Sequence, residues 1–161
     1  MGLNERVFIG LGANLGDAAQ TLRAAIAAIA ALPGTHMKAQ SALYLSAPVD
    51  AEGPEFTNSV IEVETALEPL GLFQALQVIE TEQGRQRPYR NAPRTLDLDL
   101  LLYGARSLIT PTLTVPHPRL HQRAFTLLPL LELAPSVTHP ILGRLALQVP
   151  TVANQVIRKA P

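Results

Sequence analysis

Residues 94–102 read Arg-Thr-Leu-Asp-Leu-Asp-Leu-Leu-Leu, a leucine-rich stretch with two aspartates in it. The alternation of leucine with aspartate predicts a β-strand, because successive side chains of a strand point to opposite faces of a sheet. Asp97 and Asp99 then share one face, about 6.6 Å apart along the strand. At that separation two carboxylates repel by about 2 kcal/mol if the effective dielectric constant is about 20. A divalent metal ion or an arginine is therefore expected between them, and the alternative is a solvated edge strand with an acidic face.

The residues just before this strand are rich in arginine. Ten positions hold four of the thirteen Lys and Arg residues of the chain, at Arg85, Arg87, Arg90 and Arg94. Gly84, Pro88 and Pro93 mark the same stretch as a loop. An arginine loop next to paired carboxylates combines anion-binding with cation-binding groups. A polyphosphate that carries Mg²⁺ is the simplest ligand that satisfies both.

Composition limits the class of protein. The 161 residues suffice for one domain, over 1–161, with a proper core. Equal numbers of basic and acidic residues leave no net field that would attract nucleic acid or a membrane. The lack of cysteine excludes disulfides, thiolate chemistry and cysteine-bound metal. The first residues show no signal-peptide pattern, and no apolar run reaches the roughly 18 residues of a membrane span. We expect a cytoplasmic protein, and a monomer.

The hydrophobic periodicity predicts an alternation of strands and helices. The expected strands cover 6–11, 37–46, 56–65 and 94–102, and the expected helices cover 17–32, 69–82 and 124–133. A hairpin turn at 103–106 leads to a short strand at 108–109, and the residues after 136 are expected to pack on the rest. The order β-α-β-β-α-β predicts an α+β fold, a ferredoxin-like α/β sandwich with a mostly antiparallel sheet and added helices.

A glycine-rich stretch at 10–16 follows the first strand. Its GxGxxxG spacing is one residue longer than the dinucleotide-binding pattern, and no acidic residue lies about twenty positions further on. We therefore interpret it as a tight turn between strand and helix.

His117 and His121 have the spacing of a helical metal pair. Pro118 between them and the absence of an HExxH pattern argue against a zinc site. His117 instead forms a second basic cluster with Arg119 and Arg123, just before a helix, where phosphate oxygens could be bound. The alternative for each histidine is an ordinary surface position.

Phe56 and Asn58 lie two residues apart and so share one face of a strand. An aromatic ring can stack on a planar ligand, and an amide offers both a donor and an acceptor. Ordinary strand positions are the alternative.

These motifs together resemble the family of 6-hydroxymethyl-7,8-dihydropterin pyrophosphokinases. The resemblance rests on the arginine loop with Arg94–Asp99 and covers nearly the whole chain. Further matches are Gly-Ala-Asn-Leu-Gly-Asp at 12–17, Phe-Thr-Asn at 56–58, Gln-Gly-Arg at 83–85, Val-Pro-His at 115–117 and Arg-Ala-Phe at 123–125. Two positions depart from the family pattern. Asn91 stands where many relatives carry tryptophan, in a slightly shortened loop, and Pro118 replaces a residue that is often aromatic.

The resemblance implies Mg²⁺-dependent transfer of pyrophosphate from ATP to the hydroxymethyl group of the pterin, with release of AMP, in folate biosynthesis. Asp97 and Asp99 would hold two Mg²⁺ ions, with Asp97 the nearest candidate for a general base. The arginines that would contact phosphate are Arg85, Arg87 and Arg94. Nucleotide binding would also involve Gln77, Glu80, Leu100, His117 and Arg123. The pterin would be bound by Ser46, Ala47, Val49, Phe56, Asn58 and Phe125.

Two other functions remain open from the residues alone. The same carboxylates and arginines would serve another Mg²⁺-dependent phosphotransferase or phosphohydrolase with a different acceptor. They would also fit a nucleotide-binding module without catalytic activity.

Overall fold

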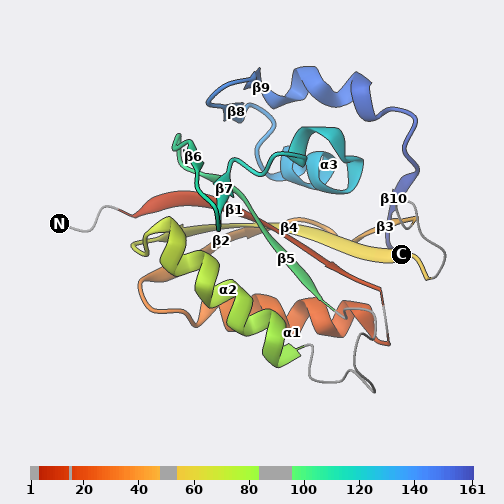
Figure 1. Ribbon diagram of the computed structural model, residues 1–161. Helices are drawn as coiled ribbons and strands as arrows, with labels where there is room; N and C mark the ends of the chain where they lie inside the picture. Colours follow the sequence, from red (N-terminus) through yellow and green to blue (C-terminus); the bar gives the residue numbers. More distant parts are fainter. Residues whose placement is uncertain (1–3, 15, 48–53, 84–95) are drawn as a thin grey trace.

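A six-stranded sheet forms the middle layer of the computed structural model, which describes residues 4–14, 16–47, 54–83 and 96–161 (Figure 1). The strands of this sheet are β1 (Glu5–Ala13), β2 (Thr35–Gln40), β3 (Tyr44–Ser46), β4 (Phe56–Thr65), β5 (Asp97–Tyr103) and β10 (Ile157–Lys159). Their order is β10-β3-β4-β1-β5, and β2 also pairs with β4. Every pairing in the sheet is antiparallel, so the predicted α+β architecture is confirmed.

Helices cover both faces of the sheet. In Figure 1, α1 (Ala18–Ala30) and α2 (Pro69–Gln83) lie below it, and α3 (Ala124–Leu133) lies above with the C-terminal part of the chain. The remaining short elements are β6 (Leu108–Ile109), β7 (Thr114–Val115), η2 (Leu120–Gln122), β8 (Thr138–His139), β9 (Gly143–Arg144) and η3 (Leu145–Val152). None of the helices in the described ranges combines the length and the apolar character needed to cross a membrane.

The sheet separates two hydrophobic cores. The lower core joins α1 and α2 to one face, with Val7, Ile9 and Leu11 of β1. The upper core joins α3 and the C-terminal segment to the other face, with Phe8 and Val60. Alternate residues of one strand thus serve different cores, as the period of two requires.

The predicted helices agree with the structure. Leu22, Ile26 and Ile29 of α1 are buried at helical spacing, and the Asp17 side chain caps the helix by accepting the N–H of Gln20 at 3.1 Å. The helix α3 begins and ends at the predicted residues.

The single strand predicted over 37–46 is wrong, because the structure breaks it into β2 and β3. The break lies at Ser41, which pairs with β4 partly through its side chain. Its N–H donates to the carbonyl of Val60, whose own N–H donates to the Ser41 hydroxyl at 3.0 Å. A hydroxyl that replaces a backbone acceptor interrupts the ladder, so that β2 and β3 pair in succession along one edge of β4.

β5 contains a β-bulge that sequence alternation does not reveal. Ile9 pairs with Leu100 and Phe8 pairs with Leu102, which leaves Leu101 as the extra residue. Up to the bulge the alternation holds, with Leu98 and Leu100 in the lower core. After it, Leu101 and Leu102 both enter the upper core.

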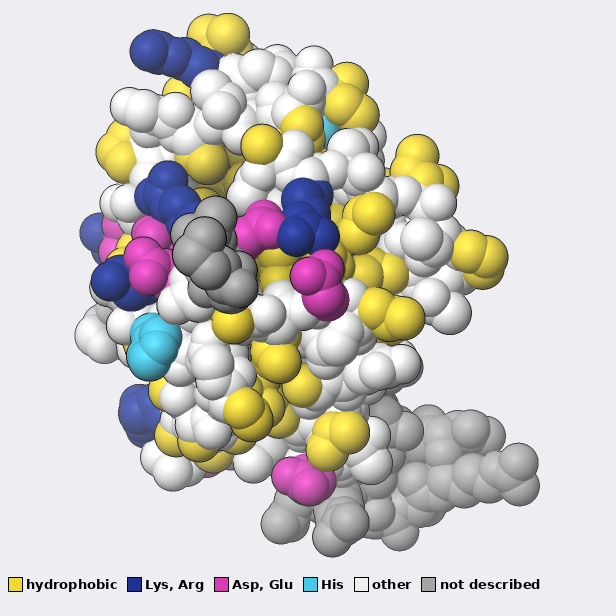
Figure 2. Space-filling model, turned by 90° about the vertical axis from the view of Figure 1, so that its left-hand side faces the viewer, with side chains coloured by type: hydrophobic (Ala, Val, Ile, Leu, Met, Phe, Trp, Pro, Cys, Tyr) yellow, Lys and Arg dark blue, Asp and Glu magenta, His cyan; other side chains and the backbone are white. Residues whose placement is uncertain are grey.

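Paired charges gather at the end of the sheet where β1 begins. Arg106 contacts Glu5 and also Glu68, at 3.0 Å, while Arg6 pairs with Glu62 at 3.0 Å. Figure 2 views the molecule from this side and shows basic and acidic side chains mixed across the middle of the face.

Candidate active site

A cavity of about 180 Å³ lies between the sheet and the first turn of α3, at the opposite end from the charge cluster around Arg106. It brings together residues from β1, β3, β4, β5 and α3 that are far apart in the sequence. Its lining consists of Gly10, Leu11, Gly12, Ser46, Ala47, Phe56, Asn58, Ser59, Asp97, Asp99, Arg123, Phe125 and Thr126.

The floor of the cavity is a row of residues across three neighbouring strands. Gly12 pairs with Asn58 on one side and with Asp97 on the other, and Gly10 pairs with Asp99. A Cβ atom on Gly12 would lie 3.2 Å from the Asn58 Oδ1 atom. Glycine therefore keeps the floor open between an amide and a carboxylate.

The turn predicted over residues 10–16 is wrong at its first two glycines, Gly10 and Gly12. The strand β1 extends to Ala13, so Gly10 and Gly12 lie inside the strand and not in the turn after it. Gly16 does belong to the turn, with a φ of 59° that favours glycine. The period of two places Gly10 and Gly12 on the same face as Phe8, and this was the signal that could have identified them as site residues.

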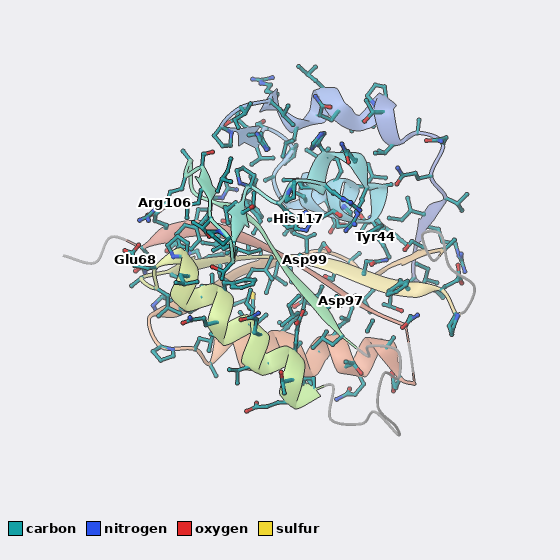
Figure 3. The ribbon with its side chains drawn as sticks, viewed as in Figure 1. Tyr44, Glu68, Asp97, Asp99, Arg106 and His117 are labelled. Carbon is teal, nitrogen blue, oxygen red and sulfur yellow. The ribbon has the colours of Figure 1, made fainter. Side chains whose placement is uncertain are left out.

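Asp97 and Asp99 share the cavity face of β5, as the alternation predicts, and both are half-buried. The Nε2 atom of His117 lies 3.8 Å from Oδ1 of Asp99 (Figure 3). The described residues contain no cluster of three or more His, Cys, Asp or Glu side chains that would hold a metal ion by itself. Two carboxylates nevertheless suit Mg²⁺, which is usually held by one or two carboxylates together with water and phosphate oxygens.

Backbone hydrogen bonds fix the orientation of His117. Its N–H donates to the carbonyl of Leu101 at 2.9 Å, which ties the segment to β5. Its Nδ1 accepts the N–H of Arg119 at 3.1 Å, so the neutral ring carries its proton on Nε2, the atom that faces Asp99. Burial lowers the pKa of His117, and the charges of Arg123 and Arg119 lower it further, against the opposing effect of Asp99.

His117 and His121 do not form a pair. His121 lies on η2 with its ring 6.4 Å from that of His139, in an edge-on arrangement. The two histidines thus have different neighbours, Asp99 for His117 and His139 for His121.

The Asn58 side chain is held in one orientation. It is 3% exposed, and its Nδ2 donates to the Ser46 hydroxyl at 2.8 Å and to the Phe56 carbonyl at 3.4 Å. Ser46 in turn lies in β3, which pairs with β4 at Phe56. The predicted pterin-binding residues Ser46, Phe56 and Asn58 therefore form one packed group.

The roof of the cavity is the first turn of α3. Arg123 is the N-cap residue, and its guanidinium lies 5.5 Å from the centre of the Phe125 ring. A cation above an aromatic face is attracted by the ring. Both Arg123 and Phe125 also line the cavity. Thr126 and Ser59, which sequence reasoning missed, complete the lining.

Four of the described residues predicted to bind nucleotide lie outside the cavity lining, and one of them is His117, which lies next to Asp99. Gln77 is exposed on α2. Glu80 accepts the N–H of Leu98 at 2.7 Å and so holds α2 against the edge of β5. Leu100 is buried in the lower core, on the other face of the sheet, so its side chain does not reach the cavity and only its backbone is left for a contact. The predicted residues Val49, Arg85, Arg87 and Arg94, and the unusual Asn91, fall outside the described residues, and their roles stay predictions.

Comparison with known proteins gives a consistent result. A family model described as 7,8-dihydro-6-hydroxymethylpterin-pyrophosphokinase (HPPK) matches residues 8–135. Two relatives are named 2-amino-4-hydroxy-6-hydroxymethyldihydropteridine pyrophosphokinase. The relative from Pseudomonas aeruginosa is 47% identical over 137 residues, which cover 84% of this chain and 85% of that protein. The relative from Haemophilus influenzae is 43% identical over 134 residues, which cover 83% and 84%.

Solved structures share the fold. The crystal structure of wild-type Plasmodium falciparum HPPK-DHPS matches with a TM-score of 0.73 at 14% identity, over 91% of this chain and 44% of that one. The same protein with pterin and p-hydroxybenzoate matches with a TM-score of 0.71 at 13% identity, over 93% and 43%. This chain thus spans less than half the length of those structures, and at such low identity the likeness shows the fold alone.

Proposed function

Because the chain belongs to the 7,8-dihydro-6-hydroxymethylpterin-pyrophosphokinase family and is therefore a diphosphotransferase, we propose that it transfers pyrophosphate from ATP to the hydroxymethyl group of 6-hydroxymethyl-7,8-dihydropterin. The product would enter folate biosynthesis, and AMP would be released. The row of Asn58, Gly12 and Asp97 across three strands supports this activity best. It puts a group suited to recognise a heterocycle beside a group suited to hold a metal ion.

The pterin ring fits the part of the cavity near Asn58. The amide, held by Ser46, offers its remaining hydrogen-bonding capacity to the polar edge of the ring. Phe56 and Phe125 line the same space and can flank a flat ring. The hydroxymethyl group then lies toward Asp97, across the open position of Gly12.

Asp97 and Asp99 would hold Mg²⁺, and we expect two ions. When bound, such ions would neutralise the negative charge that develops on the phosphates during phosphoryl transfer. The His117 Nε2–H group and the Arg123 guanidinium offer donors to the phosphates of ATP. Arg85, Arg87 and Arg94 are proposed to add further phosphate contacts.

The hydroxymethyl oxygen attacks the β-phosphorus of ATP, the bond from that phosphorus to the oxygen that links it to the α-phosphorus breaks, and AMP leaves with that oxygen. The proton of the hydroxyl group has to leave as well, and Asp97 is the carboxylate in the same row as Asn58 that could accept it.

A product assay tests this function. The protein is incubated with ATP, Mg²⁺ and 6-hydroxymethyl-7,8-dihydropterin, and the nucleotides and pterins are separated. We expect AMP and pterin diphosphate in equal amounts, and no AMP when the pterin is omitted. Formation of ADP, or turnover of ATP without pterin, would contradict the proposal and favour another phosphotransferase or a phosphohydrolase.

The substitution Asp97→Asn tests the carboxylate site. It preserves size and removes the charge, so we expect kcat to fall by at least about 100-fold, in the range seen when one electrostatic group of an active site is lost. Glu64→Gln is the matched control, because it removes a carboxylate of β4 that pairs with Arg6, at the end of the sheet away from the cavity. It should leave kcat unchanged. Titration calorimetry with a non-hydrolysable ATP analogue should show Mg²⁺-dependent binding that weakens in the variant. Full activity of Asp97→Asn would contradict the proposed role of this carboxylate. Binding of the analogue that needs no Mg²⁺ and is unchanged in the variant would favour the module without catalytic activity.

A further inference from the structure

The first turn of α3, taken with its N-cap residue, carries three residues of the cavity lining, Arg123, Phe125 and Thr126, but has no side-chain cap of its own. The first N–H groups of a helix have no partner within the helix and need acceptors from elsewhere. Arg123 occupies the N-cap position, and its side chain makes no capping hydrogen bond. The first N–H groups of α3 therefore need hydrogen-bond acceptors from outside the helix.

Gln155 supplies the missing partner from the C-terminal segment. Its Oε1 accepts the N–H of Ala124, the first residue of α3, at 2.7 Å. Its Nε2 donates to the carbonyl of Gln122 at 2.8 Å. The two bonds grip the backbone immediately before and after Arg123, so one side chain fixes the peptide units from which Arg123 projects.

The backbone of Gln155 is itself held on both sides. Its N–H donates to the carbonyl of Val152, a buried residue of the upper core, at 3.0 Å. Two residues further on, Ile157 begins β10 and pairs with Ser46, a residue of the cavity. Figure 1 shows this segment running beside α3 and down to β10, next to β3. Gln155 therefore connects two walls of the cavity through a segment that is anchored at both ends.

The first turn of α3 also borders a second cavity. This cavity has a volume of about 500 Å³, and Gln155, Gln122 and Ala124 are among its lining residues. Four residues line both cavities, namely Ser46, Ala47, Arg123 and Phe125. A shift of the turn would therefore change both cavities, because they share these four residues.

We propose that Gln155 is a positioning residue, which sets the placement of Arg123 and Phe125 in the cavity by bridging Gln122 and Ala124. This role rests on the proposed function, since it assigns Gln155 an effect on substrate binding. It lies outside the residues that the family model matches, 8–135.

The hydrogen bond from Ala124 to Gln155 can be tested without a measurement of catalysis. Hydrogen exchange of the Ala124 amide, followed by NMR, reports the bond to Gln155. In Gln155→Ala this exchange should accelerate by about tenfold, as expected for the loss of one hydrogen bond. Gln155→Glu keeps an oxygen that can accept the Ala124 N–H but loses the donor to Gln122, so its Ala124 exchange should stay close to that of the wild type. Asn154→Ala, the neighbouring exposed position, is the matched control and should exchange like the wild type.

The effect on the site is tested by kinetics. Gln155→Ala should raise the KM for the pterin by about tenfold, because a displaced binding group loses much of its contribution, while Asn154→Ala should not. In a Phe125→Ala background the same substitution should have less than a threefold effect on the KM for the pterin, since the ring proposed to flank the pterin would no longer be there to position. Gln155→Glu should give an intermediate KM.

The outcomes separate the two proposals. An unchanged exchange rate of the Ala124 amide in Gln155→Ala would show that the Gln155 side chain does not hold the first turn of α3. Accelerated exchange with a KM for the pterin equal to that of Asn154→Ala, or an equal fold-change in this KM with and without the Phe125 ring, would overturn the positioning role. A wild-type protein that makes no AMP would refute the proposed function instead, while the exchange measurement would still decide the grip.

Discussion

Among single residues, the two glycines of β1 matter for the side chains that they lack. Gly12 lies between Asn58 and Asp97 in the register of the sheet, and a Cβ atom there would crowd the Asn58 Oδ1 atom at 3.2 Å. Gly10 has room for a Cβ atom, at 3.4 Å from the Leu101 side chain. The demand for glycine is therefore stronger at Gly12, where a Cβ atom would meet its neighbour at the shorter distance.

Substitution of Gly12 tests this floor. In Gly12→Ala we expect the KM for the pterin to rise by about tenfold, because the methyl group intrudes between the ring-binding amide and the carboxylate. The thermal midpoint should change by only a few degrees, as expected for about 1 kcal/mol. Gly71→Ala in α2 is the matched control, since a Cβ atom there meets nothing within 4 Å. An unchanged KM in Gly12→Ala would show that the substrate does not cross this row.

The sequence revealed most of the individual site residues. Strand alternation placed Asp97 with Asp99, and Phe56 with Asn58, on single faces, and the structure brings both pairs to one cavity. It could not reveal Gln155, because a side-chain bond across more than thirty residues leaves no local pattern. Strand alternation does put Leu100 on the face opposite Asp97 and Asp99, and the structure buries it there, in the lower core. Its predicted nucleotide contact came from the resemblance alone.

Among the secondary-structure elements, α3 is tied to the sheet at its second end as well. The Glu132 carboxylate accepts the hydroxyl of Tyr44 and the N–H of Ala42, the latter at 3.0 Å. Burial raises the pKa of Tyr44, and the hydrogen bond to Glu132 raises it further. The hydroxyl therefore remains a donor to a charged acceptor throughout the physiological range.

Removal of that hydroxyl should loosen α3. For Tyr44→Phe we expect a loss of about 1.5–3 kcal/mol in the free energy of unfolding, the usual contribution of a hydrogen bond to a charged group. Tyr103→Phe is the matched control. Tyr103 is also buried, and its contact with Arg106 is made by the ring. Urea unfolding of both variants measures the difference, and equal losses would contradict a special role for the bond between Tyr44 and Glu132.

The hairpin β8–β9 introduces a dependence of stability on pH. The Nδ1 atom of His139 accepts the N–H groups of Ile141 and Leu142, both at 3.1 Å. Burial lowers the pKa of His139 below its ordinary value of 6.5, with a further contribution from His121. Below pH 6.5 the unfolded chain therefore binds a proton that the folded chain resists, and stability falls with pH until the lowered pKa is passed.

This dependence can be assigned to one side chain. The free energy of unfolding should decrease between about pH 7 and pH 5, and His139→Asn, which keeps an acceptor for the hairpin, should reduce the slope. His36→Asn, at an exposed position of β2, should leave the slope as it is. A slope that is unaffected by His139→Asn would assign the effect to other groups, such as His117.

Sequence periodicity predicted which elements exist better than where they break. The bounds of α3 were predicted without error, because a leucine-rich segment between Arg123 and Pro135 permits little else. The break at Ser41 and the bulge at Leu101 were missed. Each depends on how one residue meets its partner strand, which a single strand's own pattern does not contain.

In the molecule as a whole, binding and stabilising contacts lie at opposite ends of the sheet. The cavity lies where β1 ends, and the network of Arg106 with Glu5 and Glu68 lies where β1 begins. Gly104, in the turn after β5, has a φ of 55° and donates its N–H to the carbonyl of Arg6 at 2.7 Å. A Cβ atom on Gly104 would lie 2.6 Å from Oε2 of Glu5.

This separation predicts that stability can be changed without an effect on binding. Gly104→Ala should lower the free energy of unfolding by about 2 kcal/mol, from backbone strain and the displaced Glu5. Gly143→Ala shares the positive φ but meets open space, so strain alone should cost it about 1 kcal/mol. The KM for the pterin should be that of the wild type in both. If the two variants are equally destabilised, Glu5 moves aside without cost.

The order of elements predicted the class of fold, but not how the sheet is assembled. A β-α-β-β-α-β order allows several pairings, and only contacts between distant strands choose among them. The residues after 136 were expected merely to pack, whereas β10 joins the sheet beside β3 and Gln155 reaches α3. These contacts depend on the finished surface onto which the last segment folds.

The row through Gly12 has a consequence for which acceptors the proposed reaction can use. Hydrogen bonds hold neighbouring strands about 4.8 Å apart, and Asn58 and Asp97 stand on the strands that flank β1. The backbone thus fixes the distance between the point where a ring is recognised and the point where its hydroxyl reacts. Because hydrogen bonds between strands set this distance, side-chain substitutions cannot lengthen it. An alcohol carried on a longer arm would reach past Asp97 however well its ring was bound.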